Sequence, residues 1–400
     1  MGGDEVHVGS GGFRVHPRKA MEVLSRYQLP APAMFLDLWL RCAHASGASR
    51  IRIDGSARGL CVRFDGRPLL EEELRDPSAI LLGGGASARS RDLAFGLLGV
   101  LRTAPASVTV FSGDGQAGRR LWMLGLESWG IESAPFRGTA IEVDWGASPA
   151  PDWRARLGFL PAMLLAMVEV DERLLALPEY PIPNVSFRRG RVRGTLFMHH
   201  SGASLESRLD LHRAGIPVES IAARLPAPVR AVVNDEALEL DASQFAAIRG
   251  RRLALVERIV GARCKDLALR VLEGFRPRMQ AFAERVREPA LRRSWAEGLG
   301  QAEPLARETE WLRHAADGLL GLPEEDCADP ALSALWSAPL FFGAAGGTVS
   351  LAQLEAQSRA LGCVPFQRRP SQSGQRVWCP SYRDVAALTR RFGARIREEG

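Results

Sequence analysis

Few residues in this sequence have types and spacings that are typical of catalysis. His199 and His200 are adjacent at the end of a predicted strand, where a structural role is more common than metal binding. The six cysteines form no CxxC pair and no cysteine-histidine metal spacing, so we expect buried, reduced side chains. The chain lacks GxSxG and HExxH motifs, and its only lysines, Lys19 and Lys265, lie in no Walker A loop. These absences argue against serine hydrolases, zinc proteases and P-loop NTPases.

Asp37 and Arg41 have a spacing that places two charged groups on one face of a helix. They lie within a predicted helix over residues 33–45, whose apolar side chains recur at helical spacing. Because four residues separate them, the simplest interpretation is an ion pair between Asp37 and an arginine at the surface or at an interface. His44, near the end of this helix, is interpreted as a structural residue.

Length and composition limit the classes of protein to consider. A chain of 400 residues is expected to form two or three domains. Hydrophobic residues make up 46% of the chain and charged residues 24%, which excludes global disorder. The longest apolar stretch, 157–170, has the length of a buried helix and is too short to span a bilayer. The amino terminus has no signal pattern, so we expect a cytoplasmic protein that does not associate with membranes.

The charge is strongly biased toward arginine but is not concentrated in one region. Only two of the 52 basic residues are lysines, a bias that a GC-rich genome explains. The net charge of +6 is spread along the chain, which disfavours nucleic-acid binding. The densest run, Arg188–Arg193, predicts a solvated turn between strands. The alternative is that this run grips a phosphate or an acidic partner.

Helices followed by antiparallel strands predict an α/β sandwich of the α+β kind for residues 13–145, rather than a doubly wound parallel sheet. A first helix is predicted at 18–27 and a short one at 95–101. Between them, the glycines at 83–85 and the Ala/Ser/Arg stretch that follows predict a mobile loop. Strands are predicted at 50–54, 59–64, 107–111, 121–126 and 139–143.

The rest of the chain alternates strands and helices. Strands are predicted at 193–198, 207–211 and 229–233, and helices at 244–260 and 264–288. The last region is predicted to have a strand at 340–342, a capped helix from Ser350, and strands near Val364 and Val377. We place the domains at residues 1–150, 151–290 and 291–400. A stretch rich in proline and alanine at 147–152 ends the first, and the third comprises a helical connector and the region after a proline- and acid-rich segment at 323–330.

Four segments of the first region follow one another in an order that one family of ATPases shares. Residues 36–45, LDLWLRCAHA, are similar to a helix reading R-E-L-x-x-N-A-x-D-A, and residues 62–69, VRFDGRPL, to a D-x-G-x-G turn. Residues 95–100, FGLLGV, are similar to a lid end I-G-x-F-G-x-G, and residues 137–141, RGTAI, to a G-T strand. This order resembles the ninety-kilodalton heat-shock chaperones (the heat shock protein 90 family), including bacterial high-temperature protein G, of the GHKL ATPase superfamily.

Later segments extend the resemblance to nearly the whole chain. Residues 192–197 resemble the first strand of that family's middle domain, 229–244 its G-V-V-D-S-x-D-L-x-L-N-x-S-R segment, and 339–354 a second αβα unit. The resemblance implies a degenerate ATPase domain of the GHKL or histidine-kinase-like fold. A unit like domain 2 of ribosomal protein S5 and a second αβα unit would follow it. Nothing resembles the family's carboxy-terminal dimerisation domain, so a family-type dimer is not expected.

The resemblance also implies which residues stand at the catalytic positions. Asp37 falls where the family has the glutamate that deprotonates the attacking water, and it is one methylene shorter. Arg41 falls where an asparagine ligates magnesium, but a guanidinium cannot ligate a cation, so we expect no metal. Gln244 replaces an arginine that reaches the γ-phosphate. Asp37 is therefore a degenerate base position.

The implied nucleotide pocket is vestigial. The family's adenine-binding aspartate falls on Phe64, and Asp65 one step along points to the other face of the strand unless a bulge restores it. The positions that would complete this vestigial pocket are Asp65, Gly66, Gly96, Gly99 and Thr139. We expect no cofactor, although the pocket leaves room for ATP or ADP bound without turnover.

Together these departures predict a chaperone-like pseudo-ATPase. We expect it to bind protein partners as a scaffold or adaptor in a bacterial complex. Two alternatives stay open: an active ATP-dependent chaperone of the same family type, and a nucleic-acid-binding protein.

Overall fold

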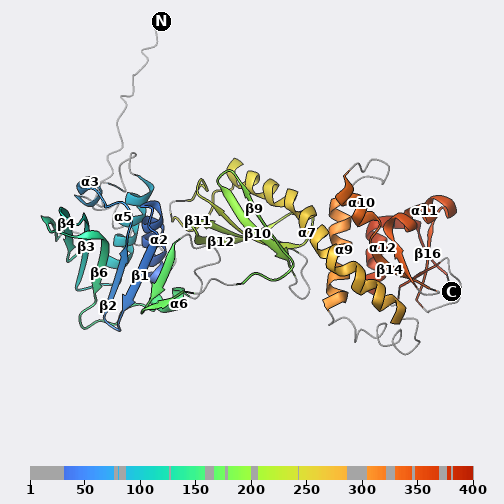
Figure 1. The fold of residues 1–400 in the computed structure, drawn as a ribbon, viewed down its shortest axis with the longest axis horizontal. Helices are drawn as coiled ribbons and strands as arrows, with labels where there is room; N and C mark the ends of the chain where they lie inside the picture. The colour runs from blue at the N-terminus through green and yellow to red at the C-terminus, as the bar shows by residue number, and fades with distance from the viewer. Residues whose placement is uncertain are drawn as a thin grey trace, which may run out of the picture. The chain divides into compact units, whose positions relative to one another are not determined.

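The chain divides into two compact units, which are described separately. The first comprises the residues up to Pro178 together with His212–Val218 and Glu239–Ile248, and the second comprises the remainder. The computed structural model describes residues 31–75, 80, 87–125, 128–157, 166–175, 179–199, 206–241, 243–285, 304–320, 329–344, 347–368, 376–379 and 382–399 (Figure 1). The predicted helix at 18–27, the glycines at 83–85 and His200 lie outside the described residues.

An eight-stranded sheet with the order β5-β4-β3-β6-β2-β1-β7-β8 forms the framework of the first unit. Its strands are β1 (Arg50–Gly55), β2 (Gly59–Phe64), β3 (Ser107–Asp114), β4 (Gly118–Met123), β5 (Trp129–Ser133), β6 (Arg137–Asp144), β7 (Met167–Val170) and β8 (Arg173–Leu174). Neighbours are antiparallel except β1 and β7, which run parallel. The five strands predicted here are present. Both β7 and β8 lie beyond the boundary placed at residue 150, and β7 is formed by the end of the longest apolar stretch, 157–170.

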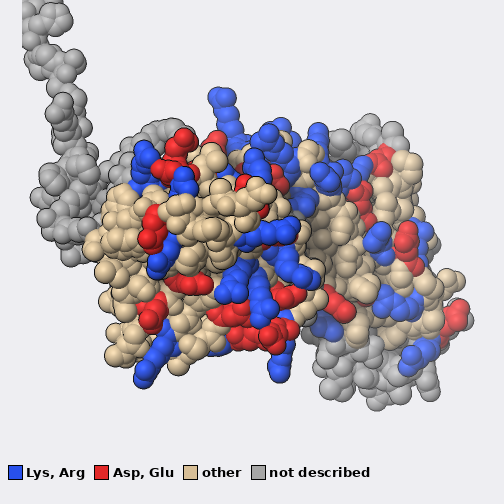
Figure 2. Space-filling model, turned by 60° about the vertical axis from the view of Figure 1, so that its left-hand side comes forward, with Lys and Arg blue, Asp and Glu red and all other residues tan. Residues whose placement is uncertain are grey.

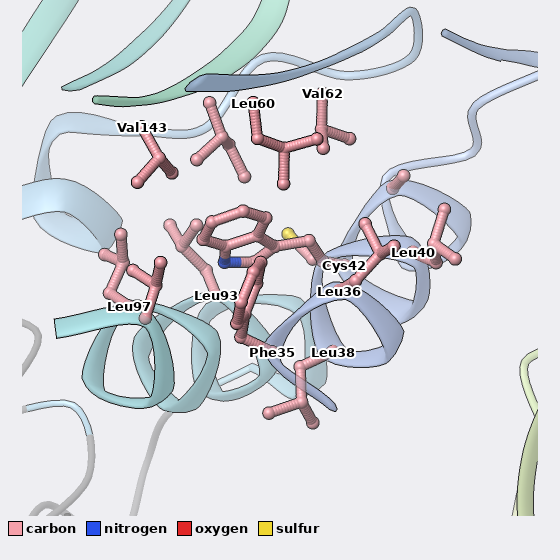
Figure 3. Close-up of a cluster of buried hydrophobic side chains, with 14 of the residues drawn as sticks. Phe35, Leu36, Leu38, Leu40, Cys42, Leu60, Val62, Leu93, Leu97 and Val143 are labelled. Atoms are coloured by element: carbon pink, nitrogen blue, oxygen red, sulfur yellow. The ribbon is translucent and has the colours of Figure 1, made fainter. Parts of the chain in front are cut away.

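Helices α2 (Phe35–Ala45) and α5 (Ala88–Leu101) cover one face of this sheet (Figure 1). Alternate residues of β2 are buried, from Leu60 to Phe64, which gives the sheet one apolar face for the helices. Figure 3 shows Leu60 and Val143 pointing from the sheet toward side chains of both helices. Helix α2 confirms the helix predicted at 33–45. A 3-10 turn, η1 (Pro32–Met34), precedes it.

The Ala/Ser/Arg stretch that was expected to be a loop is instead the first turn of α5. Ser87 caps this helix, because its hydroxyl accepts a hydrogen bond from the N–H of Ser90 at 3.2 Å. The cap lets the helix begin seven residues before the predicted start at Phe95. Two short helices, α3 (Glu71–Arg75) and α6 (Trp153–Leu157), complete the described helices of the first unit.

The second unit contains most of a five-stranded sheet with the order β12-β11-β13-β10-β9. Its strands are β9 (Asn184–Arg189), β10 (Val192–Met198), β11 (Ser207–Arg213), β12 (Ile216–Ala223) and β13 (Val229–Asp235). Helix α7 (Arg251–Arg285) lies along this sheet (Figure 1). Residues 212–218, where β11 ends and β12 begins, cluster with the first unit.

Helix is confirmed over most of the stretches predicted at 244–260 and 264–288. The predicted break between them and the predicted start at 244 are wrong, because one continuous helix occupies Arg251–Arg285 and a turn precedes it. In this turn the carboxylate of Asp241 accepts from the N–H of Ser243 at 3.0 Å, and the Ser243 hydroxyl accepts from the N–H of Phe245 at 3.1 Å. Gln244 has a φ of 65°, which a helix does not allow. Local side-chain hydrogen bonds therefore outweigh the helical pattern of the apolar residues.

Among its described residues, the carboxy-terminal part of the second unit has a sheet with the order β15-β14-β17-β16-β18, four α-helices and a 3-10 turn, η3 (Gly393–Arg395). The strands are β14 (Pro339–Gly343), β15 (Thr348–Ser350), β16 (Val364–Gln367), β17 (Val377–Trp378) and β18 (Ile396–Glu398); the helices are α9 (Pro304–Leu319), α10 (Pro330–Trp336), α11 (Leu351–Leu361) and α12 (Tyr382–Phe392). The predicted strands are confirmed. The predicted cap is confirmed too, since Ser350 and Gln353 form a reciprocal capping box.

The fold is thus of the mixed α+β class, as the sequence predicted. Among the described residues, no helix combines the length and the apolar character needed to cross a membrane.

Candidate functional site

Asp37, the predicted base position, is fully buried on α2 and engaged in an ion pair with Arg156 of α6. The Nε of Arg156 donates to both carboxylate oxygens, at 2.9 and 3.1 Å, and its Nη2 also donates to Oδ2. Burial raises the pKa of Asp37, and the hydrogen bond and charge of Arg156 oppose that rise. The carboxylate is therefore committed to a structural contact. The pairing of Asp37 with Arg41 that the sequence suggested is wrong, and Arg41 acts on Asp37 only through its charge.

Arg41 is also buried, with 1% of its surface exposed, rather than at the surface. Its Nη1 donates to the carbonyl oxygen of Gln244 at 2.7 Å, and its Nη2 donates to that of Pro217 at 3.0 Å. The guanidinium also lies 5.1 Å from the centre of the Phe245 ring, within cation–π range. All these residues belong to the first unit. Arg41 thus ties α2 to two segments that lie about 180 and 200 residues further along the chain.

A second buried acid, Asp92 of α5, lies close enough to Arg41 for their charges to interact. Burial raises the pKa of Asp92 to about 6, while the positive charges of Arg41 and Arg213 oppose the rise. Burial likewise lowers the pKa of Arg41, and the charge of Asp92 is the largest opposing effect. The sequence analysis missed Asp92, although its spacing from Gly96 and Gly99 could have placed it on the buried face of the helix. It lies four residues before Gly96 and seven before Gly99, on the helix face that packs inward.

Asp65 is exposed and serves the turn after β2 rather than a pocket. Its carboxylate accepts from the N–H of Ser49 at 2.7 Å, the Ser49 hydroxyl at 2.5 Å and the N–H of Arg50 at 2.9 Å. The register of β1 and β2 is continuous up to the pair Ile51 and Phe64, so no bulge shifts Asp65 to the helix side. Gly66 belongs to the same turn, with a φ of 105°, and a Cβ there would lie 2.7 Å from the Ser46 carbonyl.

The remaining predicted pocket residues are packed inside the domain. A Cβ on Gly96 would lie 2.3 Å from the indole nitrogen of Trp39, so this glycine permits the close approach of α5 to α2. Gly99 is buried on the same helix. Thr139 is buried in β6, where its hydroxyl and that of Ser112 share a hydrogen bond of 2.8 Å. The structure thus brings none of these glycines together with Asp65 around a shared cavity among the described residues.

Large apolar side chains fill the space between the helices and the sheet. Phe35 and Trp39 are fully buried with ring centres 4.8 Å apart, and Phe64 is 4% exposed at the position implied for the adenine aspartate. Figure 3 shows part of this cluster. A hollow of about 480 Å³ lies elsewhere, and it is lined by Glu71, Arg75, Arg119, Trp129, Ile131, Glu132 and Ser133. Arg119 and Arg75 both pair with Glu71 there, so the charges of the hollow are largely internally satisfied.

No metal cluster of three or more histidine, cysteine or acidic side chains occurs in the part of the chain that the structure describes. Comparison with protein-family models gave no match, and comparison with curated proteins gave none either. The likeness to the heat-shock chaperones therefore rests on the order of the sequence motifs.

Proposed function

We propose that this protein is a chaperone-related pseudo-ATPase that acts by binding protein partners, as a scaffold or adaptor. The observation that carries the proposal is the hydrogen bond from Arg41 to the carbonyl of Gln244. By the resemblance, these residues stand at the metal-ligand position and the γ-phosphate position. Here the guanidinium at the first position donates to the main-chain carbonyl at the second, and this contact supports the proposal that neither position serves a cation or a phosphate.

The other groups that nucleotide hydrolysis would need also form hydrogen bonds within the protein. Asp37 is held by Arg156, and Asp65 by Ser49 and Arg50. Exchanging the contact between Asp37 and Arg156 for a nucleotide would leave a buried charge without its partner, which costs several kcal/mol. A general base must also be free to accept a proton from water, and the carboxylate of Asp37 is occupied.

We expect the purified protein to show no magnesium-dependent ATP hydrolysis above the buffer rate. Millimolar ATP or ADP, with or without magnesium, should also leave its melting temperature unchanged, because a ligand that binds the native state must raise it. Phosphate release measures the hydrolysis, and differential scanning fluorimetry measures the melting temperature.

Two isosteric variants serve as controls for this prediction. Steady turnover that disappears in Asp37→Asn, with the fold intact, would establish an active ATPase and would favour the ATP-dependent chaperone. A saturable rise in melting temperature with ADP that is lost in Asp65→Asn would show that the protein binds nucleotide without hydrolysing it.

A further inference from the structure

The tip of the β9–β10 hairpin gathers four arginines, and no described carboxylate forms an ion pair with them. Residues 180–205 contain four arginines, Arg188, Arg189, Arg191 and Arg193, and no acidic residue. The register places Arg188 directly opposite Arg193, so two like charges lie on one face of the hairpin. Arg189 directly precedes the turn, Arg191 is its second residue, and both are exposed. Like charges in this position destabilise the hairpin unless an anion lies between them.

Two arginines on elements that adjoin this hairpin are, by contrast, paired with carboxylates. Arg230 of β13 bonds Asp210 of β11 at 2.6 Å, and Arg252 of α7 bonds Asp235 at 2.5 Å. Among the described residues, none of the four hairpin arginines has a carboxylate within 4.0 Å. Burial and the charge of Arg188 both lower the pKa of Arg193, while Glu236 opposes them.

The hairpin is rigid enough to present these charges in a fixed arrangement. Its two-residue turn has Gly190 at the first position with a φ of 60°, as tight hairpins require. Ser186 and Thr195 share a hydrogen bond of 2.9 Å across the strands. The ring of Phe187 lies directly over Gly194, where a Cβ would approach it to 2.8 Å. The cost of ordering this surface on binding is therefore small.

We propose that this hairpin tip binds an acidic segment of a partner protein, whose carboxylates pair with the four guanidinium groups. Arginine suits this role because its planar group binds carboxylates in a bidentate manner. A nucleic acid would need a continuous basic track of several phosphate contacts. The paired state of Arg230 and Arg252 interrupts such a track, and Figure 2 shows basic and acidic side chains interleaved over the face that it displays. This inference rests on the proposed partner-binding function and names the chemistry of the partner.

The test measures binding of a fluorescent oligoglutamate peptide to the full chain by anisotropy, at low salt and without nucleotide. One variant changes Arg188, Arg189 and Arg191 to glutamine, and leaves the half-buried Arg193 in place. The matched control changes Arg224, Arg258 and Arg285 to glutamine; these are exposed residues of the second unit, and they remove the same charge. Unchanged melting temperatures confirm that both variants fold.

We expect the hairpin variant to bind the peptide about tenfold more weakly, as the loss of three exposed ion pairs implies, and the control to bind it within about twofold of the original. Equal losses in both variants, or no binding by the original protein, would overturn the proposal. Tighter binding of an oligothymidylate of matched charge, lost in the hairpin variant, would assign the hairpin to nucleic acid instead. Because nucleotide is absent, none of these outcomes depends on whether the protein hydrolyses ATP.

Discussion

Replacement of Arg41 by methionine is expected to lower the free energy of unfolding by about 3–5 kcal/mol, the usual cost of removing one partner from a buried charge pair. Methionine fills similar volume, but it leaves the carbonyls of Gln244 and Pro217 without the donor that now lies at 2.7 and 3.0 Å. It also leaves Asp92 without its main opposing charge. Urea unfolding monitored by circular dichroism measures this loss.

A local measurement separates this effect from a general loss of stability. The amide hydrogens of Asp241 and Ile248 bond across the turn that Arg41 holds, so their exchange with solvent should accelerate in Arg41→Met. The control is Arg75→Met, which removes a 70% exposed side chain paired with Glu71 and should cost less than about 1 kcal/mol. A loss in Arg41→Met no larger than the control's, with the turn still protected, would refute the role assigned to Arg41.

Asp92→Asn is expected to stabilise the protein at neutral and higher pH. The pKa of Asp92 is about 6 in the folded state, above the ordinary value of 3.8, so the folded chain holds a proton that the unfolded chain has released. Stability from this group is therefore present at low pH and is lost as the pH rises from about 4 through 6. Above that range the ionised Asp92 costs about 3 kcal/mol, since each pKa unit corresponds to 1.36 kcal/mol.

Urea unfolding of the original protein and of Asp92→Asn at pH 4.5, 6 and 8 measures the difference in their free energies of unfolding. These values lie below, at and above the pKa of Asp92, which is about 6. The stabilisation by asparagine should be largest at pH 8, slightly smaller at pH 6, and reduced to about a third of its full size at pH 4.5. Asp152→Asn is the control, because Asp152 is exposed and asparagine can still accept from the N–H of Ala155, now bonded at 3.0 Å. A difference for Asp92→Asn that does not change with pH, or a destabilised variant at pH 8, would contradict the prediction.

The sequence predicted the elements that are specified by local patterns, in which the order of residue types indicates burial or capping directly. The alternation of Leu60, Val62 and Phe64 in β2, and the capping box at Ser350, are local patterns, and both appear as expected. The turn at Gln244 was missed because side-chain hydrogen bonds within a few residues outweighed an apolar pattern that resembles a helix.

The candidate site was harder to predict, because spacing shows which helix face a residue shares but not what lies opposite. The pairing of Asp37 with Arg156 joins residues 119 positions apart, and that of Arg41 with Gln244 joins residues 203 apart. A local partner four residues away is the natural guess for each charge. The actual partners are distant in sequence, because a fully buried charged group requires well-placed hydrogen-bonding partners and these come from other segments of the chain.

The division of the chain has a consequence for any attempt to cut it into pieces. The first unit is assembled from three separate stretches, and the polypeptide passes between the units five times before its end. A fragment that stops at Pro178 would contain Arg41 but neither carbonyl that accepts from it. Gene truncation, domain exchange and fusion at that junction would therefore produce an incomplete half. The first unit can therefore be complete only when the chain is made through to residue 248 at least.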